Sequence, residues 1–497
     1  MRDSATGLAT KVPHVFTDQR SSEAQLKALS LKFSETSTAS VTSADFLFVP
    51  PLPDLPVREL SSLAFVHKVS RNGLQVWSHR AYRQDWLEQG FFGSKRVLLN
   101  KPEMIHRVLV ENHNNYRRTD TAIRLLRPLV GDGLLLSTGE DWKHQRRTIA
   151  PALAPKMLPL LARHVVECTD EDVQSLARRN GAPFALLPEM QALALKIAAR
   201  SMFSLETWEH GPAVQSAMMR FTRECARARL SDMIVPLPVP TYHDIARARF
   251  RARWSALVDR IIEARERMPD AGAPRDLFDL LRAARDPESG AAFTRAELRD
   301  QIGTMIVAGH ETTAHTLFWS LYLLASSPEH QAMVAAEVRG VDLSPTHAGE
   351  VFPTLNYTRA IVSEALRLYP PVWVLTRQCV MPEEIEGLRI ARGTLVMISP
   401  WVLHRHSSHW SNPNAFDPGR FLPDAAPPKR FTYLPFGAGP RVCVGAQFAM
   451  AEATLVLARL VQAFQVELAD GKPVRPTAVV TTGPDRAVPF RLSCRDA

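Results

Sequence analysis

One predicted helix constrains the fold more than any other element of this sequence. Thr294 and Glu297 form a capping box, in which a threonine hydroxyl and a glutamate carboxylate bond each other's backbone N–H groups at a helix start. Phe293 and Leu298 accompany it as a hydrophobic staple, and no proline follows until Pro328. These limits predict a helix of about 30 residues, roughly 45 Å long. A helix so long and apolar is expected to run through the middle of the protein.

The rest of the chain alternates helical stretches with proline-rich connectors. Short β-like segments occur at 74–77, at 388–398 and at 478–492, the last one broken by Gly483 and Pro484. The predicted class is mainly α with small β-sheets. Residues 1–45 are rich in Ser, Thr and Ala without a sustained period, which predicts a mobile N-terminal tail. Because no second linker or repeat appears, we expect 46–497 to form a single domain.

Composition narrows the class of protein. Hydrophobic residues make up 45% of the chain, which is typical of a globular protein with a large core. No apolar run approaches the roughly 20 residues of a membrane span, and the N-terminus lacks a secretory signal pattern. The five cysteines are scattered without a C-x-x-C pair, which favours a reducing compartment, so we expect a cytoplasmic protein. The net charge of +9 is dispersed, which favours an acidic protein partner over nucleic acid.

The segment 435–445 contains the cysteine with the strongest functional signal. Two glycines and a proline predict an irregular loop, and a helical pattern begins directly after Gly445. Cys443 thus precedes a helix N-terminus, where the helix dipole favours a thiolate, and Arg441 adds positive charge. A thiolate there is a good ligand for a soft or borderline metal. The alternative is a buried, inert cysteine.

This loop resembles a known haem-binding motif. Its pattern, Phe436-x-x-Gly439-x-Arg441-x-Cys443-x-Gly445, is similar in every position to the haem-binding loop of the cytochrome P450 superfamily. The resemblance implies that Cys443 is the axial ligand of the haem iron, that Phe436 packs against it, and that Arg441 pairs with a haem propionate. It also implies the cytochrome P450 fold, with the long central helix over haem b (iron protoporphyrin IX).

The long helix carries a second motif. Ala308 and Gly309 have little side-chain bulk, so a ligand can approach the backbone, and the Thr312 hydroxyl can bond the carbonyl one turn back. The segment is similar to the oxygen-activation motif of the superfamily, which implies cofactor contact at Gly309 and proton delivery by Glu311 and Thr312. Taken alone, the segment more often indicates a helix that merely contains polar residues.

Two histidine groups resemble metal sites without meeting their geometry. The segment from His310 to His315 has one residue more than the zinc motif H-E-x-x-H, so the two rings point about 140° apart around a helix. His404, His406 and His409 have no cysteine or carboxylate at ligand spacing. We therefore expect no zinc site at either place.

Further motifs extend the resemblance. Glu364 and Arg367 stand at i and i+3, a spacing that by itself is common for surface ion pairs. The resemblance implies that they bond Arg420 from a downstream segment and lock the core behind the haem. It assigns further propionate-binding roles to Trp142, Arg146 and Arg377.

The resemblance also places a substrate pocket. Its positions are Met305, Ile306, Ala308, Val372, Trp373, Val374, Val480 and Thr481. The set is mostly apolar, which indicates a hydrophobic small molecule (a fatty acid, terpenoid, steroid or aromatic compound), although plain core residues have the same character.

The implied activity is a haem-thiolate monooxygenase that inserts one oxygen atom of O₂ into its substrate. Since no reductase domain follows, electrons from NAD(P)H are expected to arrive through a reductase and a ferredoxin or flavodoxin. Two alternatives remain open. One is a haem-thiolate enzyme that rearranges or reduces its substrate or consumes peroxide, against which Glu311 and Thr312 argue. The other is a haem sensor or carrier without enzymatic activity.

Overall fold

The computed structural model describes residues 47–204, 210–269 and 272–495. The chain divides into two units, Met1–Leu47 and Phe48–Ala497. The predicted tail, 1–45, lies outside the described residues.

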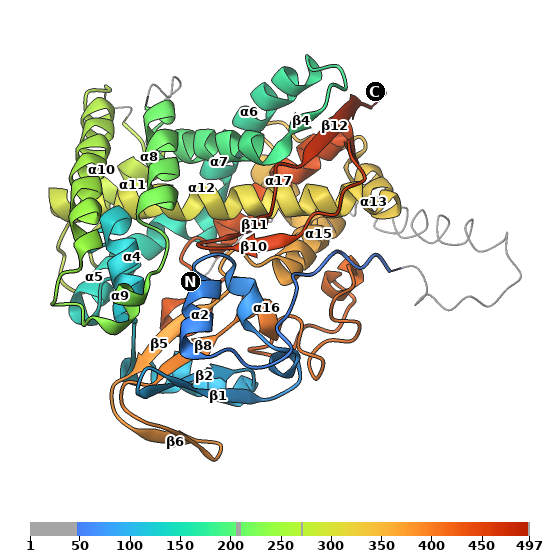
Figure 1. Cartoon of the computed structure of the whole chain (residues 1–497). Coiled ribbons are helices and arrows are strands. Elements are labelled where there is room, and N and C mark those ends of the chain that lie inside the picture. The colour runs from blue at the N-terminus through green and yellow to red at the C-terminus, as the bar shows by residue number, and fades with distance from the viewer. Residues whose placement is uncertain (1–46, 205–209, 270–271, 496–497) are drawn as a thin grey trace, which may run out of the picture. The chain divides into compact units, whose positions relative to one another are not determined.

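Helices make up most of the larger unit (Figure 1). Their bounds are α2 Ser62–Val69, α3 Pro102–His106, α4 Asp120–Val130, α5 Gly139–Ile149, α6 Leu158–Ala177, α7 Leu186–Phe203, α8 Gly211–Glu224, α9 Leu230–Ile234, α10 Tyr242–Glu266, α11 Leu277–Ala283, α12 Arg295–Ala325, α13 Pro328–Val338, α14 Ala348–Val351, α15 Asn356–Leu368, α16 Pro400–Leu403 and α17 Ala446–Ala463.

The strands form small sheets. Their bounds are β1 Trp86–Phe91, β2 Ser94–Leu99, β3 Tyr116–Arg117, β4 Phe184–Ala185, β5 Leu375–Cys379, β6 Glu383–Ile385, β7 Leu388–Ile390, β8 Leu395–Ile398, β9 Phe464–Leu468, β10 Pro476–Ala478, β11 Thr482–Pro484 and β12 Pro489–Cys494. The largest sheet has the order β1-β2-β8-β5-β3, in which only β2 and β8 run parallel. The others are β4-β12-β9, β10-β11 and β6-β7. The prediction of a mainly α fold with small sheets is confirmed.

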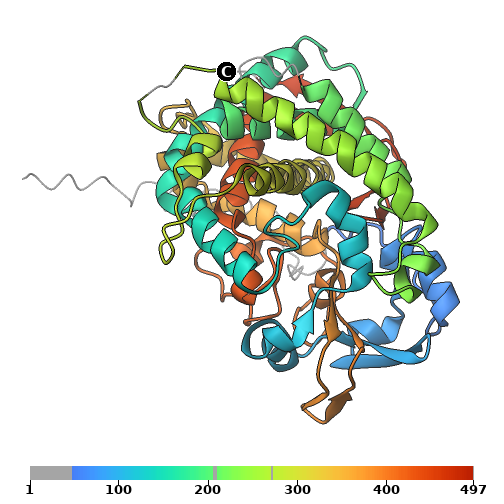
Figure 2. The same ribbon diagram turned by 90° about the vertical axis from the view of Figure 1, so that its left-hand side faces the viewer.

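The predicted long helix is α12, which has 31 residues. Its capping box forms as expected, because the Thr294 N–H donates to Glu297 Oε2 at 2.8 Å and the Glu297 N–H donates to Thr294 Oγ1 at 3.2 Å. Figures 1 and 2 show α12 from the side and nearly end-on, with other helices around it. Almost all of its second half, from Thr313 to Leu324, is buried. The helix therefore runs through the core.

One short β prediction is wrong. Residues 74–76 belong to a 3₁₀ turn, Gly73–Val76, whose first N–H groups are capped by the Asn72 side chain at Leu74 N. The same Asn72 oxygen accepts from Ala478 N at 3.0 Å, which ties the turn to β10. The predicted β segments at 388–398 and 478–492 do contain strands, and Gly393, with φ +83°, makes the turn between β7 and β8.

Among the described residues, no helix combines the length and the apolar character that crossing a membrane requires.

Candidate active site

The cysteine loop is fixed by close backbone packing. Gly437 and Gly439 have φ values of +73° and +74°, a conformation that glycine adopts without strain. A Cβ atom on Gly439 would lie only 2.0 Å from the Leu109 carbonyl oxygen, so the loop approaches that backbone more closely than any other residue type permits. The Cys443 N–H closes the loop by donating to the Phe436 carbonyl at 2.9 Å. Cys443 is thereby held three residues before α17.

The surroundings of Cys443 act on its ionisation in opposite directions. Protein atoms around the accessible thiol raise its pKa, whereas the Gly445 N–H and the Arg146 guanidinium lower it, and the net shift is upward. The Gly445 N–H and Arg146 thus favour a thiolate, as expected. Their effect on the pKa is smaller than that of the protein atoms that displace water from the thiol. The cation that acts on Cys443 is Arg146, not Arg441. A thiolate at this position gains most from a positively charged metal bound directly to it.

Three arginines gather near the loop without an acidic partner. Burial, together with the guanidiniums of Arg377 and Arg441, lowers the pKa of Arg118 to about 9. Burial and Arg441 lower the pKa of Arg377 to about 10. In the described part of the chain, no carboxylate offsets these effects, and Arg118 Nε and Arg441 Nη1 are buried without a hydrogen-bond partner. Buried like charges with free donors fit an anion with several oxygen atoms.

Helix α5 supplies the other two predicted cofactor contacts. The guanidinium of Arg441 lies 4.5 Å above the ring of Trp142, and Arg441 Nη2 donates to the Ser137 carbonyl at 3.0 Å. Arg146 Nη1 donates to the Val442 carbonyl at 2.7 Å. Arg146 thus supports the backbone next to Cys443, and Trp142 orients Arg441 by a cation–π contact.

These residues fit a haem group. Cys443 offers a thiol as an axial ligand, and the three unpaired arginines offer donors for the two propionates that haem carries. The observation that decides the fit is the pair of orphaned buried guanidinium nitrogens on Arg118 and Arg441, because burying them without an anion is costly.

The predicted oxygen-activation segment occupies the middle of α12. Thr312 Oγ1 donates to the Ala308 carbonyl one turn back, as expected. A Cβ atom on Gly309 would meet no atom within 4 Å, so this part of the helix surface is open. The Glu311 carboxylate accepts from Thr481 Oγ1 at 3.3 Å, and burial raises the pKa of Glu311 more than this bond lowers it. A carboxyl group with a raised pKa is suited to carrying protons near neutral pH.

The predicted pocket positions separate into two groups. Ala308 and Val372 are exposed, and Met305, Val374, Val480 and Thr481 are partly buried. Ile306 and Trp373, in contrast, are core residues with 1% and 6% exposure. The Trp373 ring packs on Gly73, where a Cβ atom would lie 2.3 Å from it. These two residues are as buried as core side chains, and their place in a substrate pocket stays a prediction.

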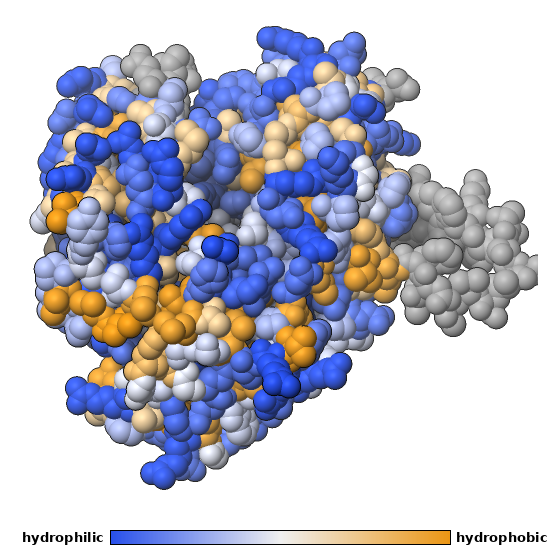
Figure 3. Space-filling view, in the orientation of Figure 1, coloured by the Kyte–Doolittle hydropathy of each residue, from blue (hydrophilic) through white to orange (hydrophobic). Residues whose placement is uncertain are grey.

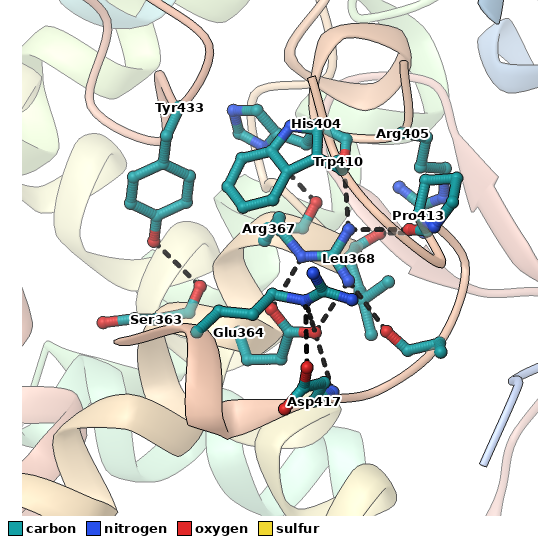
Figure 4. Close-up of polar contacts among 12 residues, drawn as sticks. Ser363, Glu364, Arg367, Leu368, His404, Arg405, Trp410, Pro413, Asp417 and Tyr433 are labelled. Carbon is teal, nitrogen blue, oxygen red and sulfur yellow. Dashed lines mark hydrogen bonds and ion pairs between the residues drawn. The ribbon is translucent and has the colours of Figure 1, made fainter. Parts of the chain in front are cut away.

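The predicted structural residues Glu364, Arg367 and Arg420 lie together. Figure 4 shows Glu364 and Arg367 with their polar contacts. Arg367 donates to both Glu364 oxygens at 2.6 and 2.7 Å, and both side chains are fully buried. Arg420 Nε lies 3.7 Å from Glu364 Oε1, and its Nη2 donates to the Ser411 carbonyl at 2.8 Å. Removing one partner of such a buried pair costs about 3–5 kcal/mol, so the arrangement is structurally important.

His404 connects this cluster to the cysteine loop. Arg367 Nη1 donates to the His404 carbonyl at 2.8 Å, and His404 Nδ1 lies 3.2 Å from the Arg367 carbonyl. The Leu434 N–H donates to His404 Nε2 at 2.8 Å, which requires a neutral ring with its proton on Nδ1. Burial lowers the pKa of His404 to about 3, which keeps it neutral. His404, His406 and His409 all bond backbone carbonyls, and no metal-binding group of His, Cys, Asp or Glu occurs among the described residues.

Sequence reasoning missed two polar residues near the site, of which one is partly buried and the other buried. Arg118 could not be identified as a site residue, because nothing in the sequence distinguishes it from the neighbouring Arg117. Glu452, buried in α17, accepts from Thr313 Oγ1 at 3.4 Å, and burial raises its pKa to about 8. Glu452 is the sole acidic residue in the α17 sequence, which was a usable signal.

Comparison with known proteins agrees with this site. The family model described as "Cytochrome P450" matches residues 74–486. Cyclooctatin synthase of Streptomyces melanosporofaciens is 35% identical over 400 residues, covering 78% of this chain and 84% of the relative. Pentalenene oxygenase of Streptomyces avermitilis is 32% identical over 400 residues, covering 79% and 87%. The crystal structure of the cytochrome P450DA haem domain has a TM-score of 0.75 at 25% identity, covering 90% of this chain and 98% of that chain.

Fold, site and relatives define a haem-thiolate monooxygenase, an oxidoreductase that inserts one oxygen atom of O₂ into a small hydrophobic substrate with electrons from a redox partner. The chain belongs to the cytochrome P450 family.

Two glycines of the loop provide a matched pair of variants. Gly437→Ala places a side chain at positive φ in open space, whereas Gly439→Ala adds a clash with the Leu109 carbonyl. We expect Gly437→Ala to lower the free energy of unfolding by about 1–2 kcal/mol and Gly439→Ala to lower it further and to reduce bound haem. Urea denaturation and haem content per chain measure both effects. Equal losses in the two variants would contradict the importance of the contact with Leu109.

The neighbouring residues Arg117 and Arg118 provide a second pair. Arg118 has an unpaired buried nitrogen, whereas Arg117 forms a partly exposed ion pair with Asp120 at 2.7 Å. We expect Arg118→Gln to accelerate haem transfer to apomyoglobin about tenfold, because one charge-assisted hydrogen bond is lost. Arg117→Gln should leave the rate unchanged. Similar rates for both variants and the parent protein would remove Arg118 from the haem site.

Proposed function

We propose that this enzyme binds haem b with Cys443 as axial ligand and oxidises a neutral cyclic terpenoid, a hydrocarbon or its monoalcohol. The observation that carries the cofactor assignment is the cluster of Arg118, Arg377 and Arg441 without an acidic partner, of which Arg441 stands two residues before Cys443 in the cysteine loop. The substrate class is supported by the relatives whose names describe pentalenene oxidation and 5-monooxygenation of cyclooctat-9-en-7-ol.

The predicted pocket residues favour an uncharged substrate. Met305, Val374 and Val480 offer apolar side chains, and Thr481 offers one hydroxyl, which already donates to Glu311. None of these positions carries a positive charge, and Arg118, Arg377 and Arg441 are assigned to the propionates. A fatty acid whose carboxylate lay among these residues would have it desolvated without a partner, which is unfavourable. A cyclic hydrocarbon or alcohol has no such cost.

The protein side chains divide the work as follows. Haem b supplies, when bound, the iron that activates O₂, and a thiolate ligand favours cleavage of the O–O bond. Arg118, Arg377 and Arg441 neutralise the propionates, and Arg146 supports the backbone beside Cys443. Ala308 and Gly309 leave room next to α12.

Proton delivery is assigned to α12. The Glu311 carboxyl, whose pKa is raised by burial, exchanges protons next to Thr312 on the same helix. The Thr312 hydroxyl, bonded to the Ala308 carbonyl, keeps its oxygen lone pairs free to accept.

The proposed function includes an electron source and a cellular compartment. We expect NAD(P)H to supply the electrons through a reductase and a ferredoxin or flavodoxin, with the +9 net charge supporting an acidic partner. Free cysteines at all five positions support a reducing compartment such as the cytoplasm.

An absorption spectrum tests the cofactor assignment. The dithionite-reduced protein with carbon monoxide should show the strongly red-shifted Soret band of a thiolate-ligated haem, and Cys443→Ala should abolish it. Cys168→Ala, at a buried cysteine away from the loop, should keep it. A histidine-type spectrum that Cys443→Ala leaves unchanged would overturn the proposed function.

Ligand titration tests the substrate class. A tricyclic sesquiterpene and straight-chain lauric acid, followed by the spin-state change of the Soret band, separate neutral rings from charged chains. We expect the sesquiterpene to bind at least about tenfold more tightly, since burying an unpaired carboxylate costs more than 1.4 kcal/mol. Tighter binding of lauric acid would reject the terpenoid assignment.

A further inference from the structure

One carboxyl group in the core has no part in the functions assigned so far. Glu452 stands in the second turn of α17, and 3% of its surface is exposed. Hydrophilic residues cover much of the protein face in Figure 3, whereas this glutamate lies in the interior. A glutamate is almost never buried as a charged group unless a partner compensates the charge. The contacts of Glu452 therefore decide whether it is ionised.

These contacts are too weak to hold a carboxylate. Among the described residues, Glu452 receives a single hydrogen bond, which Thr313 Oγ1 of α12 donates at 3.4 Å, and no cation acts on the carboxyl group. A carboxylate in such surroundings is unfavourable, whereas the neutral acid is not. Burial accordingly raises the pKa of Glu452 to about 8, and the bond from Thr313 lowers it by less. Glu452 therefore holds a proton at neutral pH.

The neighbouring charges do not alter this result. Helix α17 packs against α6, α12, α13, α15 and β9. The acidic groups on these elements are bonded elsewhere: Glu167 with Arg163, Asp170 with Arg459, Asp172 with Lys196, Glu311 with Thr481, Glu337 with Thr358 and Glu364 with Arg367. His310, one turn before Thr313, lies against the Gln191 backbone, and burial lowers its pKa to about 4, so it is uncharged. Glu467 of β9 is exposed.

Glu452 lies between the two helices that carry the site. Figures 1 and 2 show α17 beside α12. Helix α17 follows Cys443, the proposed axial ligand, and Thr313 directly follows Thr312 in α12. Glu452 is six residues after the first residue of α17, which is about 9 Å along the helix axis. A charge at this distance in a poorly hydrated core acts on the ligand region without contacting it.

We propose that Glu452 is a redox-linked proton site, whose carboxylate takes up a proton from water when the bound haem accepts its first electron and releases it on reoxidation. The inference rests on the proposed haem ligation by Cys443. The balanced step is Glu452–COO⁻ + H⁺ + Fe(III) + e⁻ → Glu452–COOH + Fe(II), with the electron from the redox partner. An electron added to the iron repels a nearby negative charge, so reduction favours the neutral acid.

The coupling is expected above neutral pH. Below about pH 7, Glu452 is protonated in both redox states, so the midpoint potential does not depend on it. As the pH rises through about 8, the oxidised protein loses the proton first, which stabilises ferric haem and lowers the midpoint potential. A unit charge about 10 Å away at an effective dielectric constant of about 20 changes a one-electron equilibrium by at least about tenfold, which is about 59 mV.

Three variants separate this role from packing. Glu452→Gln has the same shape and is neutral at every pH. Thr313→Val keeps the shape of the threonine but removes the hydrogen bond that favours the carboxylate. Glu467→Gln is the matched control, because it removes an exposed glutamate from β9. The midpoint potential of each haem-loaded protein is measured without substrate by spectroelectrochemical titration with redox mediators, from about pH 6 to about pH 10.

The expected results differ among the variants. The midpoint potential of the parent protein and of Glu467→Gln should fall by about 59 mV above about pH 8, a tenfold change in the equilibrium. Glu452→Gln should keep the low-pH value of the parent protein over the whole range, because the amide resembles the neutral acid. Thr313→Val should show the same fall at a higher pH. A merely structural role of Glu452 would change haem content or stability but would leave the pH dependence in place.

The inference is overturned by a midpoint potential of the parent protein that does not vary with pH, or by the same pH dependence in Glu452→Gln. If Glu452→Gln binds no haem, Thr313→Val decides, and an unchanged position of the fall rejects the inference. Failure of the proposed function is recognised beforehand, because the reduced parent protein with carbon monoxide would then lack the spectrum of a thiolate-ligated haem. A normal spectrum with a pH-independent potential rejects the role of Glu452 alone.

Discussion

The guanidinium of Arg367 is the interaction on which the placement of the site depends. It binds Glu364 on the same helix and also donates to the carbonyls of His404, Pro413 and Ala415 at 2.6–2.8 Å. Through the His404 ring the connection continues to the Leu434 N–H, where the cysteine loop begins. The segment 404–434 has little regular secondary structure, and hydrogen bonds to the buried guanidinium of Arg367 hold its first part in place. Removing the Arg367 charge from water costs free energy. This cost is offset because all of its N–H donors bond to oxygen atoms.

The site combines two electrostatic environments. Around Cys443, the neighbouring protein atoms oppose ionisation of the thiol, and around Arg118 and Arg377 burial opposes the positive charge of the guanidiniums. A single bound group with a metal cation at its centre and carboxylates at its edge would stabilise both the thiolate and the guanidiniums. Haem binding and the stability of this region are therefore expected to be coupled, since the same charges serve both.

Local patterns predicted the parts of the fold that local interactions determine. The capping box at Thr294 and Glu297 and the glycines at 437 and 439 act within a few residues, so α12 and the cysteine loop were visible in the sequence. Arg118 was not, because its role depends on Arg377, more than 250 positions away along the chain. Tertiary contact likewise decided the turn at 73–76 and buried Trp373 in the core.

Hydroxyl groups recur along α12 with a common geometry. Thr304, Thr316 and Ser320 donate to the carbonyl four residues earlier, and Thr312 does the same toward Ala308. The single hydrogen of the Thr312 hydroxyl is therefore already engaged, and only its lone pairs are free to bind the groups that take part in the proposed reaction. It can accept a hydrogen bond from a protonated oxygen atom, but it offers none to an unprotonated one. The helix backbone thus makes this hydroxyl sensitive to whether the first proton has arrived.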